Sequence, residues 1–197
     1  MLETRYLHDL YASGLSDQYI SQMGLEECDG LSIANGVLGA GNAQSAWPCS
    51  GYKIPYFDTD GNLLCNRYKV FWTEPIDKDG KAKPKYLSSV NAEWHAYFPP
   101  NFKTILDNNE YLIITEGEKK AAKAVMEGYP CVAIPGVQMW MDPVAHRLDK
   151  SMGRQLSYLT KPLSSLLSFK DKKIIILFDS DAGWNKNPDV ARARLIL

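Results

Sequence analysis

The sequence predicts an α+β amino-terminal part followed by an α/β part in which a parallel sheet is flanked by helices. Three short apolar runs, bounded by charged or turn residues, predict buried strands at residues 111–114, 130–134 and 172–178. The segment from 118 to 127 is rich in Glu, Lys and Ala and predicts a helix between the first two strands. In a fold of this class, ligands bind at the carboxyl ends of the parallel strands.

The amino-terminal part, residues 1–106, combines short helices with hairpins and many turn residues. Its clearest signal is the turn Asp58–Asn62, which contains an Asp-Gly pair. This turn separates an apolar run at 54–57 from a second run through 67–69. We therefore predict a β-hairpin at this place.

The second part, residues 107–197, begins just before the first apolar strand and ends in a helix-like segment at 190–197. Gly128 follows the predicted helix at the position where a left-handed residue commonly ends one. Pro135-Gly136 stops the second strand, and a further helical segment is expected before the third. We therefore place the boundary between the two domains at residues 106 and 107.

Carboxylates follow two of the three predicted strands. Glu116 ends the first apolar run, and Asp179 and Asp181 end the third. The two aspartates are two residues apart and share a face on an extended backbone. Mg²⁺ prefers oxygen ligands and is usually held by one or two carboxylates plus substrate phosphates. Together the two motifs predict a divalent-metal site, whereas either motif alone is more typical of a helix cap or a solvated turn.

The order of these motifs resembles the Toprim fold, which bacterial-type primases, topoisomerases and some nucleases share. Its signature is a strand, Glu116-Gly117 and a helix, followed by a strand and Asp179-Ser180-Asp181. Upstream lie a Gly-turned hairpin that runs to Arg67, the segment Pro84-Lys85-Tyr86-Leu87-Ser88-Ser89 and the pair Tyr97-Phe98. Bacterial replicative primases show a similar order before their Toprim module. The chain is similar also to a Toprim-like domain in phage, plasmid and mobile-element replication proteins, where it is frequently fused to a helicase.

This resemblance implies roles for eight residues. The catalytic residues, which also bind the metal, would be Glu116, Asp179 and Asp181. The residues that contact nucleotide or DNA would be Arg67, Lys85, Ser88, Lys119 and Lys120. The cofactor would be Mg²⁺ or Mn²⁺, and the partners would be single-stranded DNA, nucleoside triphosphates and a helicase domain or subunit.

The sequence departs from the primase pattern at positions that bear on catalysis. Ser88 stands where primases carry Asn. The second acid of the first Toprim motif is replaced around Lys119 and Lys120, a loss for which Glu118 could compensate. A further acidic element would lie beyond Leu197, so the Toprim-like part is expected to be truncated at its carboxyl end.

Composition limits the classes of partner and compartment. A net charge of −1 argues against a uniformly basic nucleic-acid binder, although lysines cluster between residues 78 and 85, where a solvated turn is the alternative. Zinc is not expected, because Cys-x-x-Cys spacing is absent among Cys28, Cys49, Cys65 and Cys131. No stretch reaches the length of a membrane helix and no signal peptide is evident, so we expect a cytoplasmic protein without membrane contact.

Three functions fit these observations. The first is the primase-like core of a mobile-element replication protein, which joins nucleotides on single-stranded DNA with divalent metal. The second is a catalytically silent Toprim-like module that binds single-stranded DNA or a helicase. The third is a Toprim nuclease, which would use the same acids to break phosphodiester bonds. For the first, we expect Arg67 and Lys85 to line one cleft.

Overall fold

The computed structural model describes residues 2–90, 93–136, 139, 147, 151–152 and 172–178. The chain groups into two compact units. The first unit comprises Met1–Tyr56 and Leu63–Glu93, and the second comprises Phe57–Asn62 and Trp94–Leu197. The boundary at residues 106 and 107 stays a prediction about which segments fold independently.

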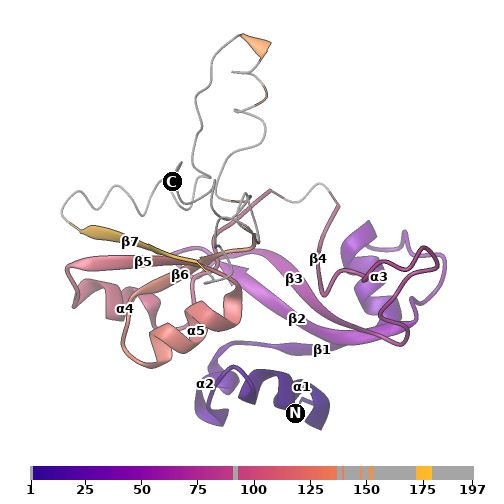
Figure 1. Ribbon diagram of the computed structural model, residues 1–197, viewed down its shortest axis with the longest axis horizontal. Coiled ribbons are helices and arrows are strands. Elements are labelled where there is room, and N and C mark those ends of the chain that lie inside the picture. The colour runs from indigo at the N-terminus through magenta and orange to yellow at the C-terminus, as the bar shows by residue number, and fades with distance from the viewer. Residues whose placement is uncertain are drawn as a thin grey trace. The chain divides into compact units, whose positions relative to one another are not determined.

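The first unit is built on a four-stranded sheet in the order β1–β2–β3–β4 (Figure 1). Its strands are β1 (Glu26–Asp29), β2 (Cys49–Phe57), β3 (Leu63–Trp72) and β4 (Tyr86–Ser88). β1 pairs antiparallel with β2, and β4 pairs antiparallel with β3. This antiparallel sheet, together with its helices, confirms the α+β prediction for the amino-terminal part.

The predicted hairpin is the connection between β2 and β3. The backbone N–H of Asp58 donates to the carbonyl oxygen of Asn62 at 2.9 Å. The carboxylate of Asp58 accepts from the backbone N–H groups of Asp60 and Asn62 at 2.9 and 2.8 Å. Gly61 has a φ of +87°, a left-handed conformation that glycine adopts without steric cost. The Asp-Gly signal in the sequence therefore corresponds to a closed turn.

Three short helices belong to the same unit, namely α1 (Thr4–Tyr11), α2 (Asp17–Gln22) and α3 (Gly30–Leu38). Two of them begin with a side-chain cap, because Ser and Asp oxygens satisfy N–H groups of the first turn. Ser16 Oγ accepts from the N–H of Tyr19 at 3.3 Å, at the start of α2. Asp29 Oδ1 accepts from the N–H of Ser32 at 2.8 Å, at the start of α3. The local sequence thus fixes where both helices start.

One face of the first sheet packs against α3. Tyr68 and Val70 of β3 form a buried cluster with Ile33 and Val37 of α3. Gly36 is required at this contact, because a Cβ there would lie 1.9 Å from the hydroxyl oxygen of Tyr68. The contact between α3 and this face of the sheet is therefore closely packed.

The opposite face of the same sheet carries an aromatic cluster. Phe71 of β3 and Tyr52 of β2 contact Tyr6 of α1, with ring centroids 5.2 Å and 5.9 Å from that of Tyr6. Residues 67, 69 and 71 of β3 share this face, because successive strand residues alternate between faces. Arg67 and Lys69 are therefore on the side of the aromatic cluster.

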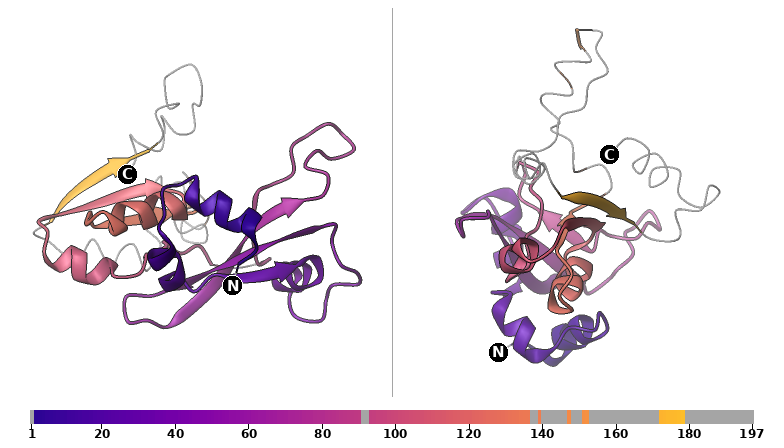
Figure 2. Two further views of the ribbon diagram at one scale, coloured as in Figure 1. Left: turned by 90° about the horizontal axis from the view of Figure 1, so that it is seen from below. Right: turned by 90° about the vertical axis from the view of Figure 1, so that its left-hand side faces the viewer.

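The second unit contains a parallel sheet in the order β6–β5–β7. The strands are β5 (Tyr111–Glu116), β6 (Cys131–Ile134) and β7 (Lys173–Leu177), and the arrows of β5 and β7 point the same way in Figure 2. α4 (Phe102–Asp107) precedes β5, and α5 (Glu118–Met126) connects β5 to β6. All three predicted strands and the predicted helix are present, which confirms the parallel α/β prediction.

Two further features complete this unit. Gly128 follows α5 with a φ of +88°, as the helix-ending prediction required. Leu112 and Ile114 of β5 and the whole of β6 are buried and supply the core. The helix predicted at 190–197 lies outside the described residues. In the described part of the chain, none of the helices is long and apolar enough to cross a membrane.

Candidate functional site

Glu116 is the last residue of β5 and is half-buried at the carboxyl end of the parallel sheet. Gly117 follows with a φ of +89° and precedes the first residue of α5. A Cβ on Gly117 would meet no atom within 4 Å, so the backbone conformation, and not a lack of space, favours glycine. The Glu-Gly signature thus turns the chain from strand to helix directly after the predicted catalytic acid.

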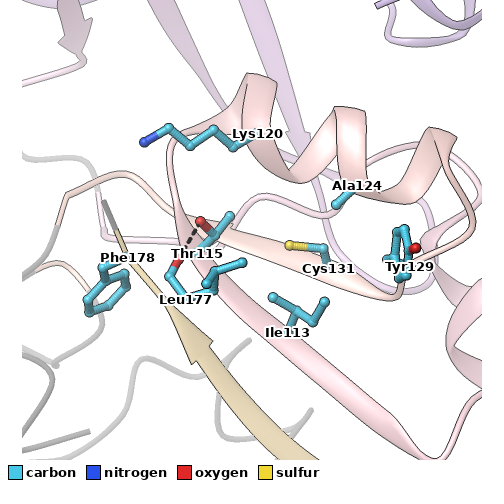
Figure 3. A pocket seen from close by; sticks show the side chains of 8 residues that line it. All are labelled: Ile113, Thr115, Lys120, Ala124, Tyr129, Cys131, Leu177 and Phe178. Atoms are coloured by element: carbon cyan, nitrogen blue, oxygen red, sulfur yellow. Dashed lines mark hydrogen bonds between the residues drawn. The ribbon is translucent and has the colours of Figure 1, made fainter. Parts of the chain in front are cut away.

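The carboxyl ends of β5 and β7 lie level with each other. The register pairs Thr115 with Leu177, and Thr115 Oγ1 donates to the carbonyl oxygen of Leu177 at 2.7 Å (Figure 3). Asp179 and Asp181 follow two and four residues after Leu177 in the sequence, but both lie outside the described residues. The sheet therefore brings Glu116 to the edge from which these acids continue, and their convergence on one ion stays a prediction.

Carboxylates at this edge have the chemistry that Mg²⁺ or Mn²⁺ requires. Within the residues that the structure describes, no three His, Cys, Asp or Glu side chains are grouped to hold a metal ion. Two of the three predicted ligands are outside that set. A divalent-metal site at this edge of the sheet therefore stays a prediction.

A second acid, Glu118, follows Glu116 by two residues in the sequence. Glu118 is the first residue of α5, and only 1% of its surface is exposed. The amino-terminal end of a helix carries partial positive charge, which favours a carboxylate in the first turn. That Glu118 compensates for the acid missing from the primase pattern stays a prediction.

Lys119 and Lys120 occupy the first turn of α5, and Lys120 is exposed. Lys120 lines a pocket of about 390 Å³ and extends on the side of Thr115 and Phe178 (Figure 3). The rest of the lining is largely apolar and consists of Ile113, Ala124, Tyr129, Cys131 and Leu177. A cation thus lies beside the strand ends that lead to the predicted metal acids.

Cys131 in this pocket is a core thiol. It is 1% exposed, and burial raises its pKa to about 12. At neutral pH such a thiol is protonated, so it is a poor nucleophile. The pocket therefore contributes shape and one cation, and the acids at the sheet edge remain the candidates for chemistry.

In the first unit, the structure brings two predicted contacts together on β3 and β4. The register pairs Arg67 with Ser88, and antiparallel partners lie on the same face. The same register pairs Lys69 with Tyr86. The ring of Tyr86 lies 5.0 Å from the guanidinium carbon of Arg67 and 4.6 Å from the Nζ of Lys69. Two cations therefore contact one aromatic ring, an arrangement stabilised by cation–π attraction.

Lys69 is a functional candidate that the sequence analysis missed. It is only 8% exposed, and its Nζ lies 4.0 Å from a carboxylate oxygen of Asp9 on α1. Asp9 also accepts a hydrogen bond from the Tyr52 hydroxyl at 2.8 Å. The sequence does contain an indication for Lys69. It lies two residues after Arg67 in a strand, so the two side chains are on the same face.

Lys85 lies on the other face from Arg67. The N–H of Val70 donates to the carbonyl oxygen of Lys85 at 2.9 Å, which continues the β3–β4 register by one pair. Val70 faces the α3 cluster, so strand alternation puts Lys85 on that side. The register thus puts these two positions on opposite faces of the sheet, and the expectation that Arg67 and Lys85 line one cleft stays a prediction. Ser88 lies on β4, the edge strand of this sheet, and Arg67 lies on its neighbour β3.

Comparison with solved structures identifies the architecture. The fold is that of the bacterial primase catalytic core. The chain matches the zinc-binding and RNA polymerase domains of the Aquifex aeolicus primase with a TM-score of 0.59, over 97% of this chain and 48% of that one, at 16% identity. It matches a DnaG primase catalytic domain bound to single-stranded DNA with a TM-score of 0.57, over 98% of this chain and 58% of that one, at 17% identity.

The primase-like chain thus spans about half the length of these structures. At such identities the likeness establishes the fold, while activity has to be argued from the residues. A family model described as a domain of unknown function, DUF3854, matches residues 102–196. A comparison with curated proteins finds no match.

Proposed function

We propose that the chain is the primase-like core of a mobile-element replication protein, which joins nucleotides on a single-stranded DNA template with the help of divalent metal. One observation carries the proposal. Glu116 is the last residue of β5, and β7 ends at the same edge of the sheet, at Leu177. Asp179 follows Leu177 by two residues, and the chain has the primase fold. We further propose that the protein acts in the cytoplasm together with a helicase domain or subunit.

Each set of residues has a task in nucleotidyl transfer. Glu116, Asp179 and Asp181 would hold Mg²⁺ or Mn²⁺, and a bound ion would offset the negative charge that builds up on the phosphate oxygens. Lys119 and Lys120, at the start of α5, would contact the triphosphate of the incoming nucleotide. A 3′-hydroxyl oxygen then forms a bond to the α-phosphorus and loses its proton to solvent, and the bond between the α-phosphorus and the departing pyrophosphate breaks.

The template would bind along the β4 rim of the first sheet. Arg67 and Ser88 offer donors on one face, next to the buried Lys69, and Lys85 offers an ammonium group on the other. Contacts of this kind reach the phosphates and do not read the base sequence. The similar catalytic domain was solved bound to single-stranded DNA, which supports single-stranded DNA as the class of ligand.

An incorporation assay tests the proposal. The chain, a single-stranded template, labelled nucleoside triphosphates and Mg²⁺ or Mn²⁺ should yield products whose sequence follows the template. Glu116→Gln and Asp179→Asn should reduce incorporation to background. Glu110→Gln is the matched control, because Glu110 is an exposed acid just before the opposite end of β5, and it should leave incorporation unchanged. Template-dependent products that persist in Glu116→Gln would contradict the assignment.

One observation favours the silent binding module as a second candidate. Lys120 lines a pocket with Thr115 and Phe178 at the strand ends, and the resemblance implies that primases carry an acid around Lys119 and Lys120. A nearby ammonium group lowers the affinity of a carboxylate site for a divalent cation. In this case the chain binds single-stranded DNA as proposed, but yields no product with any triphosphate or metal.

A further inference from the structure

A second group of aromatic and basic side chains lies at the other end of the β2–β3 hairpin from its turn. The Trp47 ring, just before β2, stacks on the Trp72 ring at the end of β3, with centroids 6.1 Å apart and planes inclined by 28°. The Nζ of Lys83 lies 5.2 Å from the centroid of the Trp72 ring. Both indoles are only partly buried.

Backbone contacts hold this group in place. The indole N–H of Trp72 donates to the carbonyl oxygen of Pro84 at 2.8 Å. The N–H of Lys83 donates to the carbonyl oxygen of Pro75 at 2.8 Å, and the N–H of Thr73 donates to that of Pro48 at 2.9 Å. A ring fixed in this way loses little conformational entropy when a ligand stacks on it.

The two indoles also pack against the buried cluster that contains Val70 and Val37. A hydrophobic cap on the core would account for that packing alone. It does not account for the Lys83 ammonium group over the Trp72 ring, nor for the basic segment that continues from Lys83 to the exposed Lys85. Aromatic rings interleaved with lysines are typical of surfaces that bind single-stranded nucleic acid.

Strand alternation links the group to the predicted template rim. Trp72 and Val70 share a face of β3, and Lys85 pairs with Val70. The stacked indoles are therefore on the same side of the sheet as Lys85 and opposite Arg67. Flexible single-stranded DNA could bend around the edge strand β4 and contact both faces of the sheet, whereas a stiff DNA duplex could not.

We propose that Trp72, backed by Trp47, is a stacking subsite for an unpaired base of single-stranded DNA. The base displaces the Lys83 ammonium group from the Trp72 ring, and Lys83 and Lys85 then bind the adjacent phosphates. This subsite rests on the proposed function, because its ligand is the proposed template. The positive charges of Lys83 and Lys85 attract a polyanion, and the indole rings offer a stacking surface to exposed bases. A duplex keeps its bases stacked inside and does not offer this match.

The test compares an oligothymidylate with an abasic oligonucleotide of the same length. Wild type should bind the oligothymidylate more tightly, because only that ligand has bases to stack. Trp72→Leu should weaken oligothymidylate binding by about five- to a hundredfold, the range expected for one stacked base, and leave abasic binding unchanged. Trp72→Phe should restore most of the loss. Phe57→Leu, at an exposed aromatic of the same hairpin, is the control and should have no effect.

A second variant keeps the test independent of the packing role of Trp72. Lys83→Gln should lower the slope of log affinity against log salt by about 0.7, as one lost phosphate contact requires for a single strand, while Trp72→Leu leaves the slope unchanged. Equal binding of both oligonucleotides by wild type, or an equal loss of both in Trp72→Leu, would overturn the stacking subsite alone. Failure of wild type to bind either ligand would overturn the proposed template binding as well.

Discussion

The side chains of Arg67, Lys69 and Tyr86 show how a strand pair can build a basic site in a chain without net positive charge. Tyr86 contacts both cations, and the carboxylate of Asp9 lies 4.0 Å from the ammonium group of Lys69. The ring and the carboxylate offset part of the cost of burying Lys69. A phosphate group bound at Arg67 would add a second anion to the same face.

This arrangement makes Arg67 a test at the scale of one residue. Arg67→Ala should weaken single-stranded DNA binding and lower the slope of log affinity against log salt by about 0.7, because one phosphate contact is lost. Fluorescence anisotropy over a range of salt concentrations measures both quantities. Lys78→Ala is the control, because Lys78 is exposed in the loop between β3 and β4 and should change the slope less. An unchanged slope in Arg67→Ala would remove this residue from the interface.

At the scale of elements, α3 depends on the carboxylate at its start. Hydrogen bonds from the side chain and backbone of Ser32 lower the pKa of Asp29 below its usual range. A folded-state pKa below the unfolded value means that ionised Asp29 stabilises the folded state. This contribution is present above the unfolded pKa of about 3.9 and is lost as the pH falls through the folded pKa.

Asp29→Ala should therefore lower the melting temperature at neutral pH, because α3 loses its cap. The difference from wild type should close as the pH falls below the carboxyl range, where wild-type Asp29 is also protonated. Thermal unfolding followed by circular dichroism at a series of pH values checks this. Asp107→Ala, at an exposed carboxyl of α4, serves for comparison. A melting-temperature difference that stays constant with pH would show that ionised Asp29 is not the cap.

At the scale of the whole molecule, the architecture could be predicted because its signals are local. The apolar runs at β5, β6 and β7, the Asp-Gly turn at 58–62 and the glycine after α5 each follow from neighbouring residues. The order of these elements also carried the primase resemblance. The solved primase structures have the same fold.

The site was harder to predict because it depends on register and burial. Lys69 looks like any strand lysine in the sequence, and only the packing of α1 and Tyr86 shows that it is buried. The pairing of Lys69 with Tyr86, continued by one pair, puts the positions of Arg67 and Lys85 on opposite faces of the sheet. A shift of one residue in that register would have reversed the result, and no local pattern sets it.

The central claim is that acids from the ends of β5 and β7 hold one divalent cation, and Mn²⁺ binding tests it most directly. Calorimetric titration of the chain should show binding that Glu116→Gln and Asp179→Asn each weaken about tenfold or more. The melting temperature without metal should stay the same or rise in both variants, because clustered carboxylates repel one another. Glu110→Gln should bind Mn²⁺ like wild type. Equal Mn²⁺ affinity in wild type, Glu116→Gln and Asp179→Asn would contradict the account.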